Sequence, residues 1–282
     1  MGRAENKVVV ITGAARGQGR SHAVRLAEEG ADIIAIDICR DIDTAGYGMA
    51  GNEDLEETAR LVKETGRRVV VRHADVRDYA ALRSAIEEGV AELGKIDVLI
   101  PNAGILPMGP DQPISAFTGT IDVNLAGVLN TVHAALPHFN EGVSVIIVGS
   151  IASFLPPMPS DVMAGAGYAG YRFAKHVLVD YVKALALQLA PTSGRVNSVH
   201  PTTVDTDMAF NKSMFQTYRP DLDDPTVEDV APILSAIHAM PISHVTQADV
   251  THAVVYLASD ESRYVTGSQI KIDGGALAMQ HL

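Results

Sequence analysis

The amino-terminal segment constrains the fold of this chain more than any other stretch. A β-branched run, Lys7 to Ile11, is typical of a strand that is buried on both faces of a parallel sheet. It leads into the glycine-rich segment 12–19, TGAARGQG, and then into a helical pattern over 20–29. Backbone N–H groups at a helix amino terminus, approached closely across glycines, form a phosphate site. We therefore predict a strand, turn and helix that bind the pyrophosphate of a dinucleotide.

The rest of the chain alternates between strand and helix patterns, without an internal repeat or a domain break. Further strands are predicted at 32–37, 68–72, 96–101, 143–148, 195–199 and 269–275. Further helices are predicted at 53–64, 79–93, 120–138 and 171–189, and around 231–239 and 247–258. This alternation is typical of one α/β domain over residues 1–282, with a doubly wound parallel sheet covered by helices on both faces.

The composition favours a globular protein that acts on small molecules. Apolar residues make up 47% of the 282 residues, which allows a sizeable core. The net charge of -12 argues against a nucleic-acid partner, because phosphate binding needs a clustered basic face. Cys39 is the single cysteine and the ten histidines lack metal-ligand spacing, so no metal is predicted. Without a signal-peptide or membrane-spanning pattern, we expect a soluble, cytoplasmic protein.

Acidic residues at strand ends bear on which dinucleotide is bound. Asp37 closes the second strand, where an acid hydrogen-bonds a ribose 2'-hydroxyl and repels a 2'-phosphate, which favours NAD. Arg16, in the glycine turn, favours NADP instead. We give Asp37 more weight because it is expected to lie against the ribose itself. Asp75, after the third strand, is a candidate acceptor for an adenine amino group, although a surface acid is the simpler interpretation.

Two polar segments follow the central strands. Asn102-Ala103-Gly104 is a small-residue turn at the carboxyl end of the fourth strand, where ligands of open α/β sheets bind. Ser150 leaves the fifth strand and could donate to a substrate carbonyl, or bond to local backbone. Asn124 lies in an apolar helical stretch, where a buried amide needs partners and could cap backbone or hold a water molecule.

Tyr171 and Lys175 open a long amphipathic helical pattern. Residues four apart share a helix face, so the Lys175 ammonium can lie beneath the Tyr171 phenol and lower its pKa. Such a phenol becomes a proton donor and acceptor near neutral pH. Tyr168 and Arg172 form a rival pair with the same spacing.

Three segments of irregular pattern separate these elements. Segment 38–52 is long for an α/β connection. Segment 154–167, with several prolines and methionines, is predicted to be a loop that is apolar enough to line a pocket. Segment 206–242 is predicted to form a substrate lid. The apolar residues near the start of this lid are Met208, Phe210, Met214 and Phe215.

In their order along the chain, these motifs resemble the short-chain dehydrogenase/reductase family. The resemblance covers essentially the whole chain and implies a Rossmann sheet of order 3-2-1-4-5-6-7 with NAD as cofactor. It implies that Tyr171 is the acid/base and that Ser150 orients the substrate oxygen. It also implies that Lys175 bonds the nicotinamide ribose and that Asn124 anchors a proton-relay water. The implied cofactor-binding residues are Gly13, Arg16, Gly17, Gln18, Gly19, Asp37, Ile38, Asp75, Val76, Asn102, Ala103, Gly104, Tyr171, Lys175, Pro201, Val204 and Thr206.

Departures from the common pattern narrow the resemblance. Gln18 replaces a usual apolar residue, and Thr202 replaces the glycine that commonly follows Pro201. With the long loop 38–52, they resemble the mycofactocin-associated, carveol dehydrogenase-like subgroup. This implies a hydrophobic secondary alcohol as substrate, NAD that is held without release, mycofactocin as redox carrier, and a homotetramer. We hypothesise that loop 38–52 folds over the adenosine half of NAD and slows its exchange.

Two other functions remain open from the sequence. An NADPH-dependent carbonyl or 3-oxoacyl reductase is suggested by Arg16. A dinucleotide-sensing regulator is a non-enzymatic alternative, although such proteins typically lose the tyrosine and lysine that this chain keeps.

Overall fold

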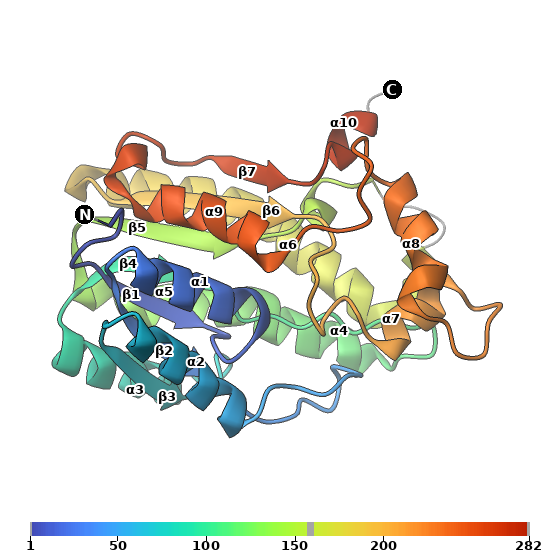
Figure 1. Cartoon of the computed structure of the whole chain (residues 1–282), viewed down its shortest axis with the longest axis horizontal. Helices are drawn as coiled ribbons and strands as arrows, with labels where there is room; N and C mark the ends of the chain where they lie inside the picture. Colours follow the sequence, from blue (N-terminus) through green and yellow to red (C-terminus); the bar gives the residue numbers. More distant parts are fainter. Residues whose placement is uncertain (1, 157–160, 281–282) are drawn as a thin grey trace.

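The computed structural model describes residues 2–156 and 161–280, with no side chains for 161–163. Seven strands form one parallel sheet of order β3-β2-β1-β4-β5-β6-β7, which confirms the predicted topology. The strands are β1 (Val8–Thr12), β2 (Asp32–Asp37), β3 (Val69–His73), β4 (Ile96–Ile100), β5 (Phe139–Val148), β6 (Arg195–Pro201) and β7 (Gln269–Ile272). In Figure 1 the strand arrows point toward one end of the molecule, which carries α7 and α8.

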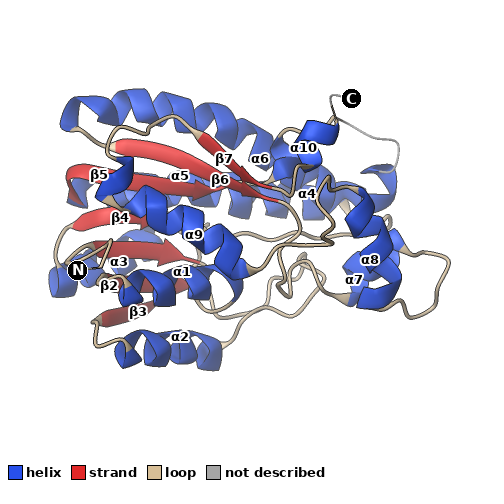
Figure 2. Ribbon diagram, turned by 45° about the horizontal axis from the view of Figure 1, so that its top comes forward, coloured by secondary structure: helices blue, strands red, loops and turns tan. Residues whose placement is uncertain are grey.

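Helices cover both faces of the sheet (Figure 2). One layer consists of α1 (Gly17–Glu28), α2 (Asn52–Glu64) and α9 (Gln247–Ala258), and the other of α3 (Tyr79–Leu93), α5 (Gly127–Ala135) and α6 (Asp161–Leu189). The shorter helices α4 (Ile114–Ile121), α7 (Lys212–Tyr218), α8 (Val227–Ala236) and α10 (Ala276–Met279) lie at the end where the strands finish. In the part of the chain that the structure describes, no helix has the length and apolarity to cross a membrane.

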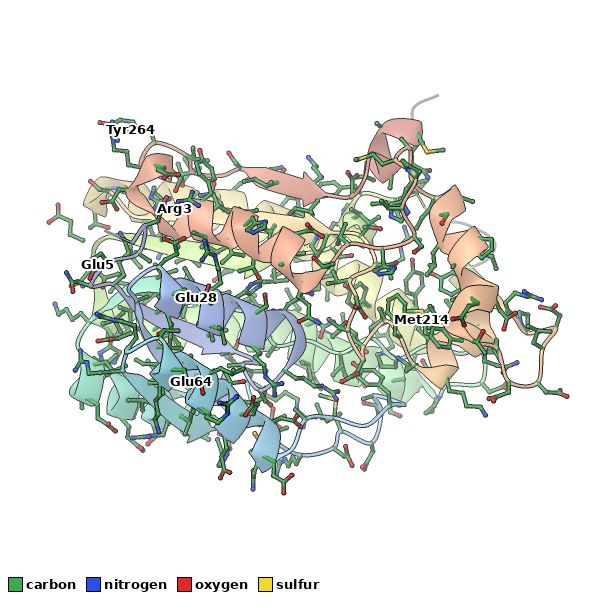
Figure 3. All side chains as sticks on the ribbon, in the orientation of Figure 1. Arg3, Glu5, Glu28, Glu64, Met214 and Tyr264 are labelled. Carbon is green, nitrogen blue, oxygen red and sulfur yellow. The ribbon has the colours of Figure 1, made fainter. Side chains whose placement is uncertain are left out.

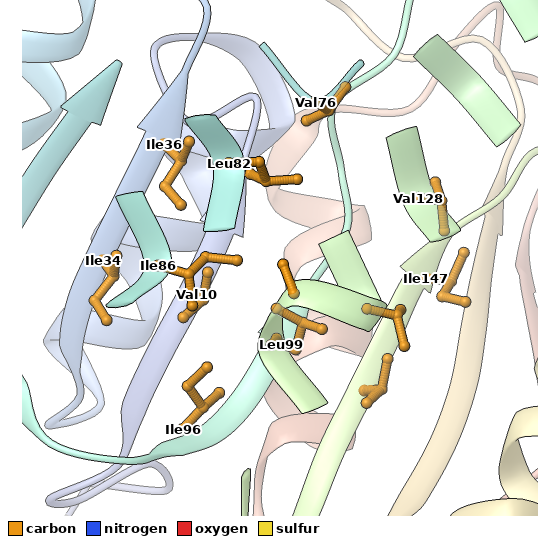
Figure 4. Packing of buried hydrophobic residues seen from close by; sticks show 14 of the residues in the cluster. Val10, Ile34, Ile36, Val76, Leu82, Ile86, Ile96, Leu99, Val128 and Ile147 are labelled. Carbon is orange, nitrogen blue, oxygen red and sulfur yellow. The ribbon is translucent and has the colours of Figure 1, made fainter. Parts of the chain in front are cut away.

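The core lies between the sheet and its helix layers. Figure 4 shows Ile34 and Leu99 on the strands facing Leu82 and Ile86 of α3, with Val128 of α5 farther along the same face of the sheet. All five side chains are at most 2% exposed. Each buried aliphatic side chain stabilises the fold by about 1.5–3 kcal/mol, so the strand ends are held on a rigid base.

Two predicted helix boundaries are wrong. The helix expected over 120–138 begins earlier, as α4, and is interrupted by a π-helical turn over Asp122–Ala126. The helix expected to open at Tyr171 begins at Asp161, so the loop prediction fails from that residue onward, while Pro157–Ser160 lie outside the described residues. Gly165, with φ of +82°, breaks this helix, and distant hydrogen bonds hold its first turns.

The helix α7 was also not predicted. Its residues lie in a stretch with a polar pattern, but Asn211 caps the helix by accepting from the Met214 backbone N–H at 3.0 Å. The cap stabilises a short helix that buries Met214. A stretch of seven residues is too short for its hydrophobic periodicity to indicate a helix.

Candidate active site

Two adjoining cavities lie at the carboxyl ends of the strands. We call the first, lined by Gly13, Gly19 and Asp37, the glycine-turn cavity, and the second, lined by Ser150 and Tyr171, the tyrosine cavity. Their empty volumes, which include open solvent, are about 900 and 930 Å³. The residues that line both are Gln18, Asn102, Gly104, Thr206 and Met208. One elongated ligand could therefore extend from the first cavity into the second.

The glycine turn is shaped by contacts that only glycine permits. Gly13 and Gly17 have φ values of +68° and +56°, which strain any residue with a side chain. A Cβ at Gly19 would collide with the Gly13 carbonyl oxygen, and one at Gly13 would lie 2.8 Å from the Ala103 Cα. Asn102 Nδ2 locks the turn by donating to the Thr12 and Gly13 carbonyls at 2.9 and 3.1 Å. The turn thus brings main chain to the cavity wall at the start of α1.

Asp37 places a carboxylate in the same cavity, at the end of β2. It is 8% exposed and accepts from the backbone N–H groups of Ala15 at 3.0 Å and Cys39 at 3.1 Å. The fixed negative charge suits a neutral hydroxyl partner and repels a phosphate. The contact of Asp37 with a ribose hydroxyl stays a prediction.

Arg16 does not point its charge at a phosphate site as the NADP interpretation requires. Its Nη1 lies 2.9 Å from the Asp207 carboxylate, and its Nη2 donates to the Gly48 carbonyl at 2.5 Å. Asp207 therefore neutralises the guanidinium, which ties segment 38–52 to segment 206–242 across the mouth of the glycine-turn cavity. Arg16 lines this cavity, as predicted, but as a bridge between its walls.

Asp75, Val76 and Ile38 line the far end of the glycine-turn cavity. Burial works to raise the pKa of Asp75, but hydrogen bonds from Arg77 and Arg40 outweigh it and lower the pKa below the usual value. The carboxylate is therefore ionised at neutral pH. Both of its oxygens already accept from Arg77 or Arg40, and the contact with an adenine amino group stays a prediction.

Several residues of this cavity were missed by the sequence analysis. Tyr47 accepts a hydrogen bond from the Leu106 backbone N–H at 3.3 Å, and burial raises the pKa of its phenol to about 12. The contact joins segment 38–52 to the turn that follows β4. The sequence signal was only the length of the segment. The other missed lining residues are Ile42, Met49, Ala50, Ala74, Ile105, Val123 and Asp207.

Tyr171, Lys175 and Ser150 come together in the tyrosine cavity. Lys175 is 4% exposed, its Nζ lies 5.6 Å from the centre of the Tyr171 ring, and it donates to the Val148 carbonyl at 2.7 Å. Burial lowers the pKa of Lys175 to about 8. Burial also raises the pKa of Tyr171, and a hydrogen bond with Ser150 offsets only part of that rise. The prediction that Lys175 lowers the phenol pKa is therefore wrong, because burial raises this pKa and the opposing contribution comes from Ser150.

Ser150 bonds to local backbone, one of the two uses considered for it, and the contact with a substrate carbonyl stays a prediction. Its Oγ accepts from the backbone N–H of Ala152 at 3.1 Å, as the cap of a short 3-10 turn, and it bonds with the Tyr171 phenol. The backbone contact uses an oxygen lone pair and leaves the O–H proton for another acceptor. The hydroxyl can therefore donate into the cavity.

Asn124 lies behind the cavities and is fully buried. Its side chain accepts from the Ile105 N–H and donates to the Ile105 carbonyl, each at 2.8 Å. The amide thus caps backbone, which was one of the two predicted uses. It fixes the turn after β4 to the π-helical turn, a geometry that recurs at functional sites. The relay water remains a prediction.

The remaining predicted residues close the tyrosine cavity. Pro201, Val204 and Thr206 line it, and the Thr206 hydroxyl donates to the Val204 carbonyl at 3.3 Å. Arg172, of the rival pair, donates to the Leu155 carbonyl at 2.5 Å, and Tyr168 lines the cavity. The apolar and aromatic wall consists of Leu106, Met108, Leu155, Tyr168, Met208, Ala209, Met214, Tyr218 and Ile237.

The residues present fit a dinucleotide. The glycine turn forms a cradle that a Cβ would fill, and an acid stands at the end of β2. Gln18 lines both cavities, and within the described residues its buried Oε1 has no hydrogen-bond partner. A ligand that spans the junction could supply that partner.

A Rossmann sheet that carries this glycine turn and a serine, tyrosine and lysine at its carboxyl edge defines a short-chain dehydrogenase/reductase, and the chain belongs to that family of oxidoreductases. A family model described as enoyl-(acyl carrier protein) reductase matches residues 13–276.

Within the family, the chain is carveol dehydrogenase-like. The (-)-trans-carveol dehydrogenase of Rhodococcus erythropolis is 40% identical to it over 98% of this chain and 99% of that protein. The crystal structure of carveol dehydrogenase from Mycobacterium avium in complex with NAD is 44% identical, covers 99% of this chain and 100% of its own, and has a TM-score of 0.93. An NAD-bound short chain dehydrogenase from Mycobacterium paratuberculosis is 38% identical, covers 98% and 100%, and has a TM-score of 0.86.

Proposed function

We propose that this chain is an NAD-dependent dehydrogenase that interconverts a hydrophobic secondary alcohol and its ketone. The observation that carries the proposal is the position of Tyr171, Lys175 and Ser150, which line an apolar cavity joined to the glycine-turn cavity. When bound, NAD supplies the hydride acceptor for the alcohol C–H. The chain must supply a group that removes the hydroxyl proton in the same reaction.

Tyr171 is the proposed acid/base. In alcohol oxidation its phenolate accepts the hydroxyl proton, and in ketone reduction its phenol returns that proton. Ser150 donates a hydrogen bond to the substrate oxygen, since its O–H is not used by the Ala152 contact. Lys175, which is held against the Val148 carbonyl, would donate to the ribose of the nicotinamide. Asn124 acts from behind, by fixing Ile105 and the π-helical turn.

NAD is the preferred cofactor in this proposal, with the relatives of known structure as support. Asp37 would accept from the ribose 2'-hydroxyl, whereas Arg16 hydrogen-bonds the Gly48 carbonyl and pairs with Asp207. An NADPH-dependent reductase, the alternative, would need a free cation at this place.

The proposed substrate class is a ring alcohol of the terpenoid or sterol type, in keeping with the carveol dehydrogenase of Rhodococcus erythropolis. Met108, Met214 and Ile237 make the wall apolar and adaptable in shape. Segment 206–242 is proposed to act as the lid over this substrate. Met214 is a residue of α7, and Figure 3 places it at the end of the molecule that carries α7 and α8.

Loop 38–52 is proposed to slow the release of NAD. Tyr47, Met49 and Ala50 line the glycine-turn cavity from this loop, and Arg16 fastens it to Asp207 through Gly48. An enzyme with such a retained cofactor needs an external carrier to reoxidise it, and mycofactocin is the proposed carrier. Denaturing the protein, purified without added nucleotide, should release NAD. No released NAD together with ordinary turnover on free NAD would contradict retention.

We also propose a homotetramer. Leu129 of α5 and Phe173 and Leu187 of α6 are 38%, 53% and 79% exposed, on helices of the same layer. Helices paired across two-fold axes would bury them. Analytical ultracentrifugation should give four times the chain mass, and L187E should reduce it.

The proposed activity is tested with a panel of secondary ring alcohols and their ketones, with NAD and NADP each as cofactor. Production of the reduced nicotinamide with NAD, at a catalytic efficiency at least about tenfold above that with NADP, is expected. Tight NAD binding without turnover of any alcohol would favour the dinucleotide-sensing regulator. A preference for NADP would favour the carbonyl reductase.

A further inference from the structure

His200 lies directly behind Ser150, at the end of β6. It is 1% exposed, and its Nδ1 lies 3.2 Å from the Ser150 backbone nitrogen and 3.0 Å from the Ser150 carbonyl oxygen. Its Nε2 lies 2.8 Å from the Ser198 hydroxyl. The imidazole therefore spans from the interior of β6 to the main chain of a residue that lines the tyrosine cavity.

Neighbouring residues hold the His200 imidazole in one position. The Phe154 ring meets it in an edge-to-face arrangement, with centroids 4.8 Å apart and planes at 62°, and Lys271 Nζ lies over the Phe154 ring, 4.9 Å from its centroid. Gly149 has no side chain here, because a Cβ would collide with the His200 ring. The ring is thus wedged between β5, from which Ser150 leaves, and the start of the 3-10 turn.

The imidazole is neutral across the working range of pH, since burial lowers the pKa of His200 to about 4 although the Ser150 contact opposes this. A neutral ring carries one N–H. With the proton on Nδ1, it donates to the Ser150 carbonyl and Nε2 accepts from Ser198. With the proton on Nε2, it donates to Ser198 and Nδ1 accepts from the Ser150 N–H. In both tautomers Nδ1 holds the main chain of Ser150.

We propose that His200 is a positioning residue, which aims the Ser150 hydroxyl by fixing the main chain from which it projects. The inference rests on the proposed role of Ser150 as the hydrogen-bond donor to the substrate oxygen. Ser150 Oγ is held by Ala152 on one side, so its direction follows from the place of its own backbone. A misplacement of about 1 Å at a reacting centre costs about 10²-fold in rate.

Two substitutions separate this role from simple core filling. H200N places an amide near the Nδ1 position and keeps the contact with Ser150, while H200Q reaches the Nε2 position and keeps only the contact with Ser198. We expect kcat of H200N within about tenfold of wild type and kcat of H200Q lower by about 10²-fold. NAD affinity and substrate KM should stay within about threefold in both.

Controls keep the outcomes distinct. S198A removes only the Nε2 partner and should leave kcat within about threefold of wild type. Should H200Q not fold, H200L, which also lacks the Nδ1 contact, takes its place. Equal kcat in H200N and H200Q, or a lower kcat in H200N, would overturn the role of His200. A fully active S150A would instead overturn the proposed function on which the inference depends.

Discussion

The two cavities that meet at Gln18 and Asn102 differ in what forms their walls, which is mainly main chain in one and side chains in the other. The glycine-turn cavity takes its shape from main chain, at Gly13 and Gly19, and its polar groups are locked by backbone hydrogen bonds. The tyrosine cavity takes its shape from side chains that come from distant segments, among them Met108, Met214 and Ile237. The glycine-turn cavity therefore depends on positions that lack a side chain, whereas the tyrosine cavity depends on the volume of the side chains that line it.

This difference predicts unequal tolerance to change. A backbone surface cannot relax around an added methyl group when the nearest atoms are themselves backbone. A wall of methionines and other flexible side chains repacks at small cost. The cofactor end should thus respond to mutation sharply and the substrate end gradually.

The largest effect is expected at Gly19. The Cβ of G19A would collide with the Gly13 carbonyl and lie 2.8 Å from Asn102 Nδ2, so the turn must open. We expect NAD affinity to fall at least about 10²-fold, measured by calorimetry on protein shown by circular dichroism to be folded. G48A is the matched control, since no atom lies within 4 Å of its Cβ and its φ is not positive. Comparable NAD affinity in G19A and wild type would show that the glycine turn can relax around an added methyl group.

The second prediction concerns pH. Tyr171 must lose its proton to act as a base, and burial raises its pKa while lowering that of Lys175 to about 8. Alcohol oxidation should therefore rise by up to about tenfold per pH unit above neutrality, because the small fraction of phenolate rises. Ketone reduction, which needs the protonated phenol, should not fall over the range in which Tyr171 keeps its proton.

NAD affinity should stay flat over the same range. In the glycine-turn cavity the pKa of Tyr47 is raised to about 12 and that of Asp75 is lowered, so neither group titrates there. Steady-state rates across a pH series test the predicted rise in oxidation, and NAD binding over the same series tests the predicted constant affinity. An oxidation rate independent of pH would contradict the role of Tyr171.

The third prediction concerns Arg16, which bridges segments 38–52 and 206–242 at the glycine-turn cavity. R16M removes the contacts with Gly48 and Asp207, and we expect NAD to dissociate about tenfold faster in stopped-flow exchange. D207N keeps the Gly48 hydrogen bond and loses only an ion pair whose acid is 67% exposed. Its effect should be at most about threefold, because exposed ion pairs contribute little. Unchanged release from R16M would show that the bridge does not retain the cofactor.

The smallest effect is expected at Met214. M214A enlarges the tyrosine cavity, so KM for a small ring alcohol should rise about threefold while bulkier alcohols are tolerated better. M214L, which conserves volume, should resemble wild type in a substrate series. A loss of NAD affinity in M214A would mean that the two ends are not independent.

Much of the fold could be predicted from the sequence because its signals are local. The β-branched runs and the glycine turn from Thr12 to Gly19 each act through neighbouring residues. The start of α6 could not, since it depends on distant bonds, from the Gly109 N–H to the Ala164 carbonyl and from the Gly167 N–H to Gln112.

The same division holds within the candidate site. Asp37 and Ser150 were predicted because strand ends place them, whereas Tyr47 reaches the cavity only through its contact with Leu106. The direction of the Tyr171 pKa shift was wrong because spacing reveals the lysine but not the depth of burial. The position of His200 behind Ser150 likewise follows from the pairing of β5 with β6.

The central claim, that Tyr171 moves the substrate proton beside bound NAD, is tested most directly by Y171F. Removing the phenol oxygen takes away the proton acceptor and leaves the glycine-turn cavity untouched. In Y171F we expect kcat to fall by about 10²-fold or more, while the Kd for NAD stays within about twofold of wild type. Turnover by Y171F at the wild-type rate would contradict it.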